Sequence, residues 1–146
     1  MTALQFLAAF VGPVAFALLF GVPRRFYPYC GLIGGTGWLF YYLSASVFTA
    51  AESTFFAAVL VMFLSRLCAV RKKCPVTIFL ISGIIPLVPG AGIYWAAFYM
   101  VTGQFAESFQ AGFAAVRAAA AIVLGIVCVY ELPQKIFRIG MEREKS

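Results

Sequence analysis

Long apolar blocks separated by charged residues dominate the pattern of this chain. A helix needs about 20 mainly apolar residues to cross the hydrocarbon layer of a bilayer, which is roughly 30 Å thick. Five blocks have about that length, and each predicts a transmembrane helix. We therefore predict an all-α integral membrane protein with about five transmembrane helices, folded as a single transmembrane domain over residues 1–132. The predicted spans cover about residues 3–23, 29–50, 53–70, 76–102 and 110–132.

The basic residues predict the orientation of these spans. Lys and Arg are enriched in cytoplasmic loops, whereas acidic residues have little influence on topology. The basic clusters follow the first, third and fifth spans, so they share one side only if the N-terminus is outside and the C-terminus is inside. We expect a multi-pass protein of the cell (inner) membrane with that orientation. The residues concerned are Arg24 and Arg25, then Arg66, Arg71, Lys72 and Lys73, and finally Lys135, Arg138, Arg143 and Lys145.

The segment 133–146 is a basic tail, which the predicted orientation puts in the cytoplasm. Ile136, Phe137, Ile139 and Met141 alternate with charged residues, as in a helix lying on an anionic membrane surface. A frayed, solvated terminus is an equally good interpretation. The topology rule explains most of the net charge of +6, so we expect the lipid bilayer and no nucleic acid as a partner.

The composition excludes several kinds of chemistry. Of the 146 residues, 11% are charged and 64% are hydrophobic, whereas soluble domains have about 25% charged residues. The chain contains neither His nor Asp, so a Ser-His-Asp triad, a His-ligated metal and an aspartyl dyad are impossible. We expect a protein that is not an enzyme, with no catalytic residue, no metal and no cofactor.

The four cysteines form no CxxC pair. They fall near the predicted cytoplasmic ends of spans, where thiols are kept reduced. We interpret them as small packing residues, with a thiolate metal site as the minor alternative. They are Cys30, Cys68, Cys74 and Cys128.

Other local patterns predict structure rather than chemistry. Thr49 and Glu52 have the spacing of a capping box at the start of a helix. Small residues in the second and fifth spans predict close helix packing, and most aromatic residues lie toward span ends, as in an interfacial belt rather than a ligand cage. The small residues are Gly31, Gly34, Gly35, Gly37 and the run from Ala114 to Ala121; the aromatic residues include Trp38, Tyr41, Trp95 and Tyr99.

The fourth span is the most informative segment. As one helix, residues 76–103 would measure about 40 Å, which is longer than the hydrocarbon layer. Pro86, Pro89, Gly90 and Gly92 interrupt it within seven residues, so we predict a broken helix. Irregular backbone at membrane depth is tolerated where it is buried in protein or lines a wet cavity, and such a segment points to a transport site. The alternative is a kinked helix held by its neighbours.

Arg117 is the second informative residue, because it is a charge inside the fifth span. If it faced the broken fourth span, its guanidinium could bind a carboxylate through two hydrogen bonds. If the span started nearer Gly112, Arg117 would instead reach the outer headgroups. Arg66 lies about one turn from the cytoplasmic end of its span and is interpreted as a snorkelling topology residue.

The segment CPVTIFLISGIIPLVPGAGIY, from Cys74 to Tyr94, resembles the threonine/serine exporter family. The resemblance is to the short subunit that corresponds to the C-terminal membrane half of the full-length exporters. It centres on Pro75, an apolar run and then PLVPG. Only motif positions can be carried over, and with Arg117 they make up the predicted substrate pathway. These positions are Pro86, Pro89, Gly90, Gly92 and Tyr94.

This resemblance implies a subunit of a secondary exporter of small carboxylate-bearing metabolites. The substrates would be threonine and serine or, in split two-protein members, dicarboxylates such as succinate. It also implies a larger membrane partner, and the absence of an internal repeat in five spans agrees with half of a hetero-oligomer. The alternative is a membrane scaffold or channel component that transports nothing itself.

Overall fold

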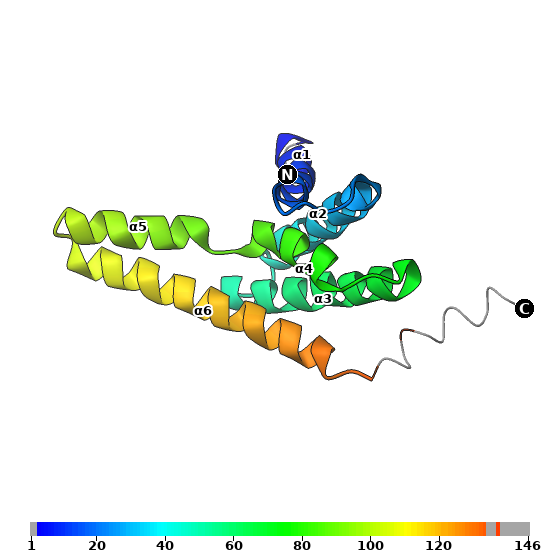
Figure 1. The fold of residues 1–146 in the computed structure, drawn as a ribbon. Helices are drawn as coiled ribbons and strands as arrows, with labels where there is room; N and C mark the ends of the chain where they lie inside the picture. The colour runs from blue at the N-terminus through cyan, green and yellow to red at the C-terminus, as the bar shows by residue number, and fades with distance from the viewer. Residues whose placement is uncertain (1–2, 134–136, 138–146) are drawn as a thin grey trace, which may run out of the picture.

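The computed structural model describes residues 3–133 and residue 137. Every regular element in that part of the chain is helical, which confirms the all-α prediction. The helices are α1 (Ala3–Leu19), α2 (Tyr27–Ser44), α3 (Ala50–Lys72), α4 (Thr77–Ile84), α5 (Gly90–Val101) and α6 (Phe105–Tyr130), with 3-10 turns η1 (Arg24–Phe26) and η2 (Ile85–Leu87) (Figure 1).

The helices form two regions. In the first, which we call the body, α1 to α4 pack together and α3 lies along the C-terminal half of α6. In the second, which we call the hairpin, α5 packs against the N-terminal half of α6 and both helices project away from the body (Figure 1). The long helix α6 therefore belongs to both regions.

Small residues allow the helices of the body to approach closely. A Cβ atom added at Gly31 would lie 2.8 Å from the Phe10 ring, and Gly34 packs against Pro13. Gly37 contacts Val61 of α3 in the same way. The predicted packing role of the α2 glycines is thus confirmed at these three positions.

Helix α3 begins and ends with defined backbone motifs. The Thr49 hydroxyl accepts from the Glu52 N–H, and Glu52 Oε2 accepts from the Thr49 N–H at 2.9 Å, which confirms the capping box. At the other end, the N–H groups of Lys73 and Cys74 both donate to the Ala69 carbonyl. Lys73 adopts the left-handed conformation there, with φ of 53°.

The number of membrane spans can be compared with the helix lengths. Within the described residues, α3 and α6 are long and apolar enough to cross a membrane. The pair Thr77–Leu87 and Gly90–Val101 would make a third span if counted together, and it is bent by 48° at its break. The apolar helix Leu4–Leu19 is shorter. Five spans and their orientation therefore stay predictions.

Two predicted boundaries differ from the helices. The second span was expected to continue to residue 50, but α2 ends at Ser44 because Thr49 caps the next helix and residues 45–48 form the connecting turn. The fifth was expected from residue 110, whereas α6 begins at Phe105. The predicted tail at 133–146 lies outside the described residues except for residues 133 and 137. The ring of Phe137 packs against the ring of Phe63.

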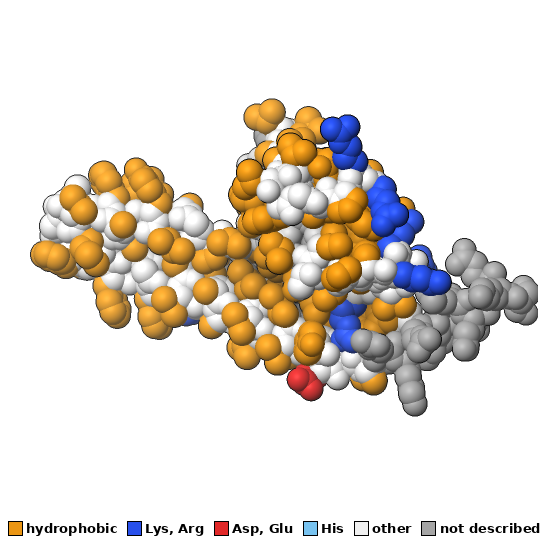
Figure 2. Space-filling view, viewed as in Figure 1, with side chains coloured by type: hydrophobic (Ala, Val, Ile, Leu, Met, Phe, Trp, Pro, Cys, Tyr) orange, Lys and Arg blue, Asp and Glu red, His pale blue; other side chains and the backbone are white. Residues whose placement is uncertain are grey.

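Basic side chains gather at one end of the body (Figure 2). The Lys72 ammonium lies 4.6 Å from the centre of the Tyr29 ring, so the end of α3 meets the start of α2. Arg25 lies over the Phe26 ring at the same end of α2. Two of the three basic clusters in the sequence are therefore adjacent in space, as the predicted orientation requires.

Candidate functional site

The break between α4 and α5 follows from its two prolines. Neither Pro86 nor Pro89 has an N–H to donate, and a proline ring clashes with the preceding helical turn. The helix tightens to η2 at Ile85–Leu87, and Val88 is then extended, with ψ of 129°. The next helix, α5, begins after Pro89, whose carbonyl accepts from the Ile93 N–H at 3.1 Å. The predicted interruption is thus present in the backbone.

A pocket of about 270 Å³ lies beside this break, and we call it the break pocket. Ile85 and Pro86 line it from η2, Gln5 and Gly12 line it from α1, and Trp38 lines it from α2. Its wall is largely apolar. The Trp38 Nε1 atom is buried and donates to none of the described residues. A buried donor without an acceptor costs free energy, and because this N–H is buried, Trp38 contributes its ring rather than an accessible donor to the pocket wall.

Trp38 is a candidate that the sequence interpretation missed, because it was assigned to an interfacial belt. No pattern in the sequence around Trp38 indicates that this residue lies beside the break, which is 48 residues later in the chain. The only local signal is the glycine-rich start of α2, which brings α1 and α4 close to this helix. Packing in three dimensions, rather than spacing, makes Trp38 part of the pocket.

Arg117 lies in a second pocket, which we call the charged groove. It has a volume of about 500 Å³ between α3 and α6, and Glu52 also lines it. Phe55 and Leu124 contribute apolar walls. Glu52 uses Oε2 in the capping box, and a carboxylate can accept further hydrogen bonds. The groove therefore offers one positive and one negative group to a ligand.

The predicted pathway residues do not all come together. Pro86 lines the break pocket, and Arg117 lines the charged groove, which none of the other predicted pathway residues lines. A Cβ atom added at Gly92 would lie 3.2 Å from Ala115 Cβ, so Gly92 serves the contact between α5 and α6. Gly90 and Tyr94 are exposed, and nothing lies near a Cβ added at Gly90. Pro89 marks the start of α5.

Arg66 has a role that its interpretation as a topology residue did not include. Its Nη1 atom donates to the carbonyls of Val129, Tyr130 at 3.0 Å and Leu132 at 2.9 Å. Its guanidinium also lies 4.5 Å from the centre of the Phe137 ring. Carbonyls at a helix C-terminus have no partner within the helix and favour a cation. Arg66 therefore fastens the end of α6 to α3.

The cysteines are all free thiols. Cys30 is buried and its Sγ lies 3.8 Å from the Ile78 carbonyl oxygen, in agreement with a packing role. Burial raises the pKa of the Cys74 thiol, although the charge of Arg25 acts in the opposite direction. In the part of the chain that the structure describes, no three Cys or Glu side chains are grouped to hold a metal ion.

The comparisons with known proteins identify a family for this chain. No solved structure matches the chain. Residues 5–131 match the family described as Threonine/Serine exporter, ThrE, so the match covers all the helices from near the start of α1 to the end of α6. Its extent includes both pockets and the break between α4 and α5. This chain belongs to the threonine/serine exporter family.

Proposed function

We propose that this chain is the short subunit of a secondary exporter and that it binds amino acids such as threonine or serine in the charged groove. Membership of an exporter family supports transport. The presence of Arg117 and Glu52 in one groove is the observation that carries the choice of substrate. An α-amino acid carries one negative and one positive group, and the groove offers the complementary pair.

Each group of the substrate has a partner in this arrangement. The Arg117 guanidinium donates two hydrogen bonds to the carboxylate, and the Glu52 carboxylate accepts from the ammonium group. Phe55 and Leu124 supply apolar walls beside the two charged groups, both of which are exposed in this chain. A dicarboxylate such as succinate would bring its second carboxylate near Glu52, which disfavours it relative to an amino acid.

The break pocket is a second contact point on the proposed pathway. Pro86 places irregular backbone beside it, and Trp38 contributes to its wall. Its volume of about 270 Å³ suits a small metabolite rather than a peptide. The backbone break at Pro86–Gly90 also allows α5 to change its angle relative to α4, which is how broken helices take part in alternating access.

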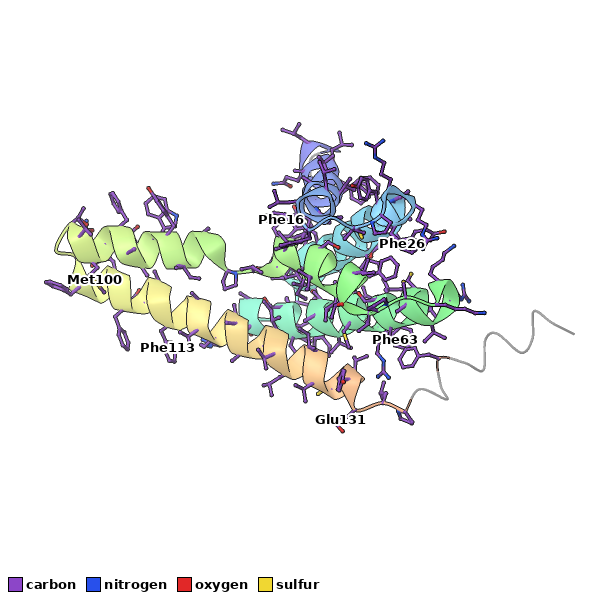
Figure 3. The ribbon with its side chains drawn as sticks, viewed as in Figure 1. Phe16, Phe26, Phe63, Met100, Phe113 and Glu131 are labelled. Carbon is purple, nitrogen blue, oxygen red and sulfur yellow. The ribbon has the colours of Figure 1, made fainter. Side chains whose placement is uncertain are left out.

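A larger membrane subunit is the proposed partner, with one or more copies of each chain in the complex. Helix α5 has no buried residue within this chain, so the sides of α5 that do not pack against α6 are available to a neighbour. The side chains of Met100 and Phe113 extend from the hairpin in Figure 3. Association through the hairpin would complete the wall of the pathway that this chain leaves open.

The proposed setting is the cell (inner) membrane, with the N-terminus outside and the basic end of the body in the cytoplasm. The charged groove then lies toward the outer side, because Glu52 is at the N-terminal end of α3 and the basic cluster is at the other end. The alternative function is a scaffold or channel component whose groove binds nothing.

Accumulation assays test the proposal. Cells that lack both subunits receive this chain and its larger partner, and intracellular labelled threonine, serine and succinate are followed with time. We expect the pair to lower threonine or serine accumulation and either chain alone to have little effect. Equal accumulation of all three compounds with and without the pair would support the scaffold alternative.

Two groove variants sharpen this test. Arg117→Ala should abolish export while leaving the amount of inserted protein unchanged, and Arg71→Ala, which removes an exposed charge outside the groove, should not. Glu52→Gln keeps the length and an oxygen that can accept from the Thr49 N–H but removes the charge, so it should reduce amino-acid export more than succinate export. If the Arg117→Ala variant retained export, Arg117 would not bind substrate, and its role would be to interact with the lipid headgroups.

A further inference from the structure

A third pocket lies at the basic end of the body, and we call it the basic pocket. It has a volume of about 510 Å³, and it lies between the end of α3 and the start of α4. Arg66 and Lys73 line it, together with Cys74, Pro75 and Val76. None of the described residues in its wall is acidic. We propose that the basic pocket binds a phosphate group, carried by an anionic phospholipid or present as free phosphate.

The backbone of Lys73 supports a role for its side chain. Lys73 has φ of 53° and ψ of 48°, and it is the one residue other than glycine with positive φ in the described ranges. Glycine adopts this conformation without strain and is the usual residue after a helix end. Strain of this kind persists at functional positions. Here the strained residue contributes an ammonium group to the wall of the pocket.

Arg66 and helix α4 add to the positive potential. Arg66 uses Nη1 for the carbonyls of α6, whereas its Nε and Nη2 groups donate to none of the described residues. Helix α4 starts beside the pocket, and its N-cap residue Val76 supplies no side-chain hydrogen bond. A helix N-terminus carries a partial positive charge and free N–H groups. The N–H groups of Ile78, Phe79 and Leu80 donate to the carbonyls of Pro75 and Val76, so the donors left for an anion in this space are the two cations and the amides of Val76 and Thr77.

Phosphate fits this combination better than a carboxylate does. A phosphate group has several exposed oxygens, so it can accept from Arg66, Lys73 and backbone amides at the same time. The site is also at the opposite end of α3 from the charged groove, so it is separate from the proposed transport site. In the predicted orientation it faces the cytoplasmic leaflet, whose lipids carry negative charge.

Cys74 provides a reporter inside the pocket. The full chain is reconstituted in nanodiscs of phosphatidylcholine alone, of phosphatidylcholine with phosphatidylglycerol, or of phosphatidylcholine with inorganic phosphate in the buffer. The rate of N-ethylmaleimide addition to Cys74 is measured by mass spectrometry, with exposed Cys128 in the same chain as the control for reagent access. Relative to phosphatidylcholine, whose phosphate is neutralised by its own choline group, we expect phosphatidylglycerol or inorganic phosphate to slow the reaction at Cys74 and to leave Cys128 unchanged.

Two variants distinguish a specific phosphate site from general attraction of anions to a basic surface. Lys73→Gly removes the charge and suits the left-handed backbone, so the variant should fold and should need a ligand concentration about fivefold higher for equal protection. Lys72→Ala removes a neighbouring charge outside the pocket and should change protection less than about twofold.

Each outcome decides the proposal. Protection by phosphatidylglycerol alone assigns the site to a lipid headgroup, and protection by inorganic phosphate assigns it to the free anion; both support a phosphate site. No protection of Cys74 in any arm would overturn it. Equal losses in Lys73→Gly and Lys72→Ala would also overturn it, because they would show only attraction to a basic surface.

Discussion

The body and the hairpin are built from equally apolar sequences but use them in opposite ways. In the body, Ala57, Val61 and Phe79 are completely inaccessible to solvent. In the hairpin, α5 has no buried residue, and Tyr94 and Phe109 are 61% and 73% exposed. Apolar composition therefore indicates a lipid environment, but it does not indicate which helices the chain packs by itself.

The position of small residues explains the difference. In the body, glycines lie where two helix axes cross, as at Gly37 against Val61 and Gly125 against α3. In the hairpin, Gly92 and the Ser108 hydroxyl, which donates to the Ala96 carbonyl at 2.7 Å, join α5 to α6 along one side. Most aromatic side chains of the hairpin are exposed, so another molecule can contact them.

The largest expected effect is at Arg66, which holds α6 in the body. Arg66→Ala leaves the carbonyls of Tyr130 and Leu132 without their charged donor, and we expect a loss of about 1.5–3 kcal/mol in the free energy of unfolding. Chemical or thermal unfolding in detergent measures this loss. Arg66→Lys keeps a charge with N–H donors but loses the planar guanidinium that lies over the Phe137 ring, so an intermediate loss is expected. An unchanged stability in Arg66→Ala would mean that α6 is held by α3 packing alone.

Two glycines of the same helix provide a matched comparison of the regions. A Cβ atom at Gly125 would lie 2.8 Å from the Phe55 carbonyl oxygen, whereas one at Gly112 would lie 3.7 Å from Ala96. Gly125→Ala should therefore destabilise the chain by about 1–3 kcal/mol through overpacking. Gly112→Ala should stabilise it by up to about 1 kcal/mol through helix propensity. The same unfolding measurement compares them, and equal changes would contradict a difference in packing between body and hairpin.

The sequence was sufficient for the features that depend on local chemistry. Thr49 and Glu52 are three residues apart, so their capping box can be recognised directly, and the prolines at 86 and 89 predict the break because they remove N–H groups. The contacts of Arg66 with α6 join residues more than 60 positions apart. Trp38 and Pro86 are likewise distant in sequence. Such pairings depend on which helices are neighbours, and periodicity along one helix does not specify this.

A smaller effect is expected at the capping box, where α3 begins. Thr49→Ala removes the hydroxyl that accepts from the Glu52 N–H, and loss of an N-cap costs about 1 kcal/mol. Thr49→Ser retains the hydroxyl and should behave like the unchanged chain. Hydrogen exchange at the first turn of α3 measures the effect locally. Unchanged protection there would show that packing of α3, rather than the cap, fixes its start.

The smallest effect on stability is expected on the hairpin, where it separates folding from association. Phe109 is 73% exposed and stacks on Phe113, with ring centres 6.1 Å apart. In the isolated chain, Phe109→Ala should change the free energy of unfolding by no more than about 0.5 kcal/mol, because exposed positions contribute little. If the larger subunit covers the hairpin, the same variant should weaken copurification of the two subunits. Val61→Ala is the matched body variant: it should destabilise the isolated chain, and any complex it still forms should be assembled normally. If the Phe109→Ala chain copurified with the larger subunit at full yield, the proposal that this face of the hairpin contacts the subunit would be wrong.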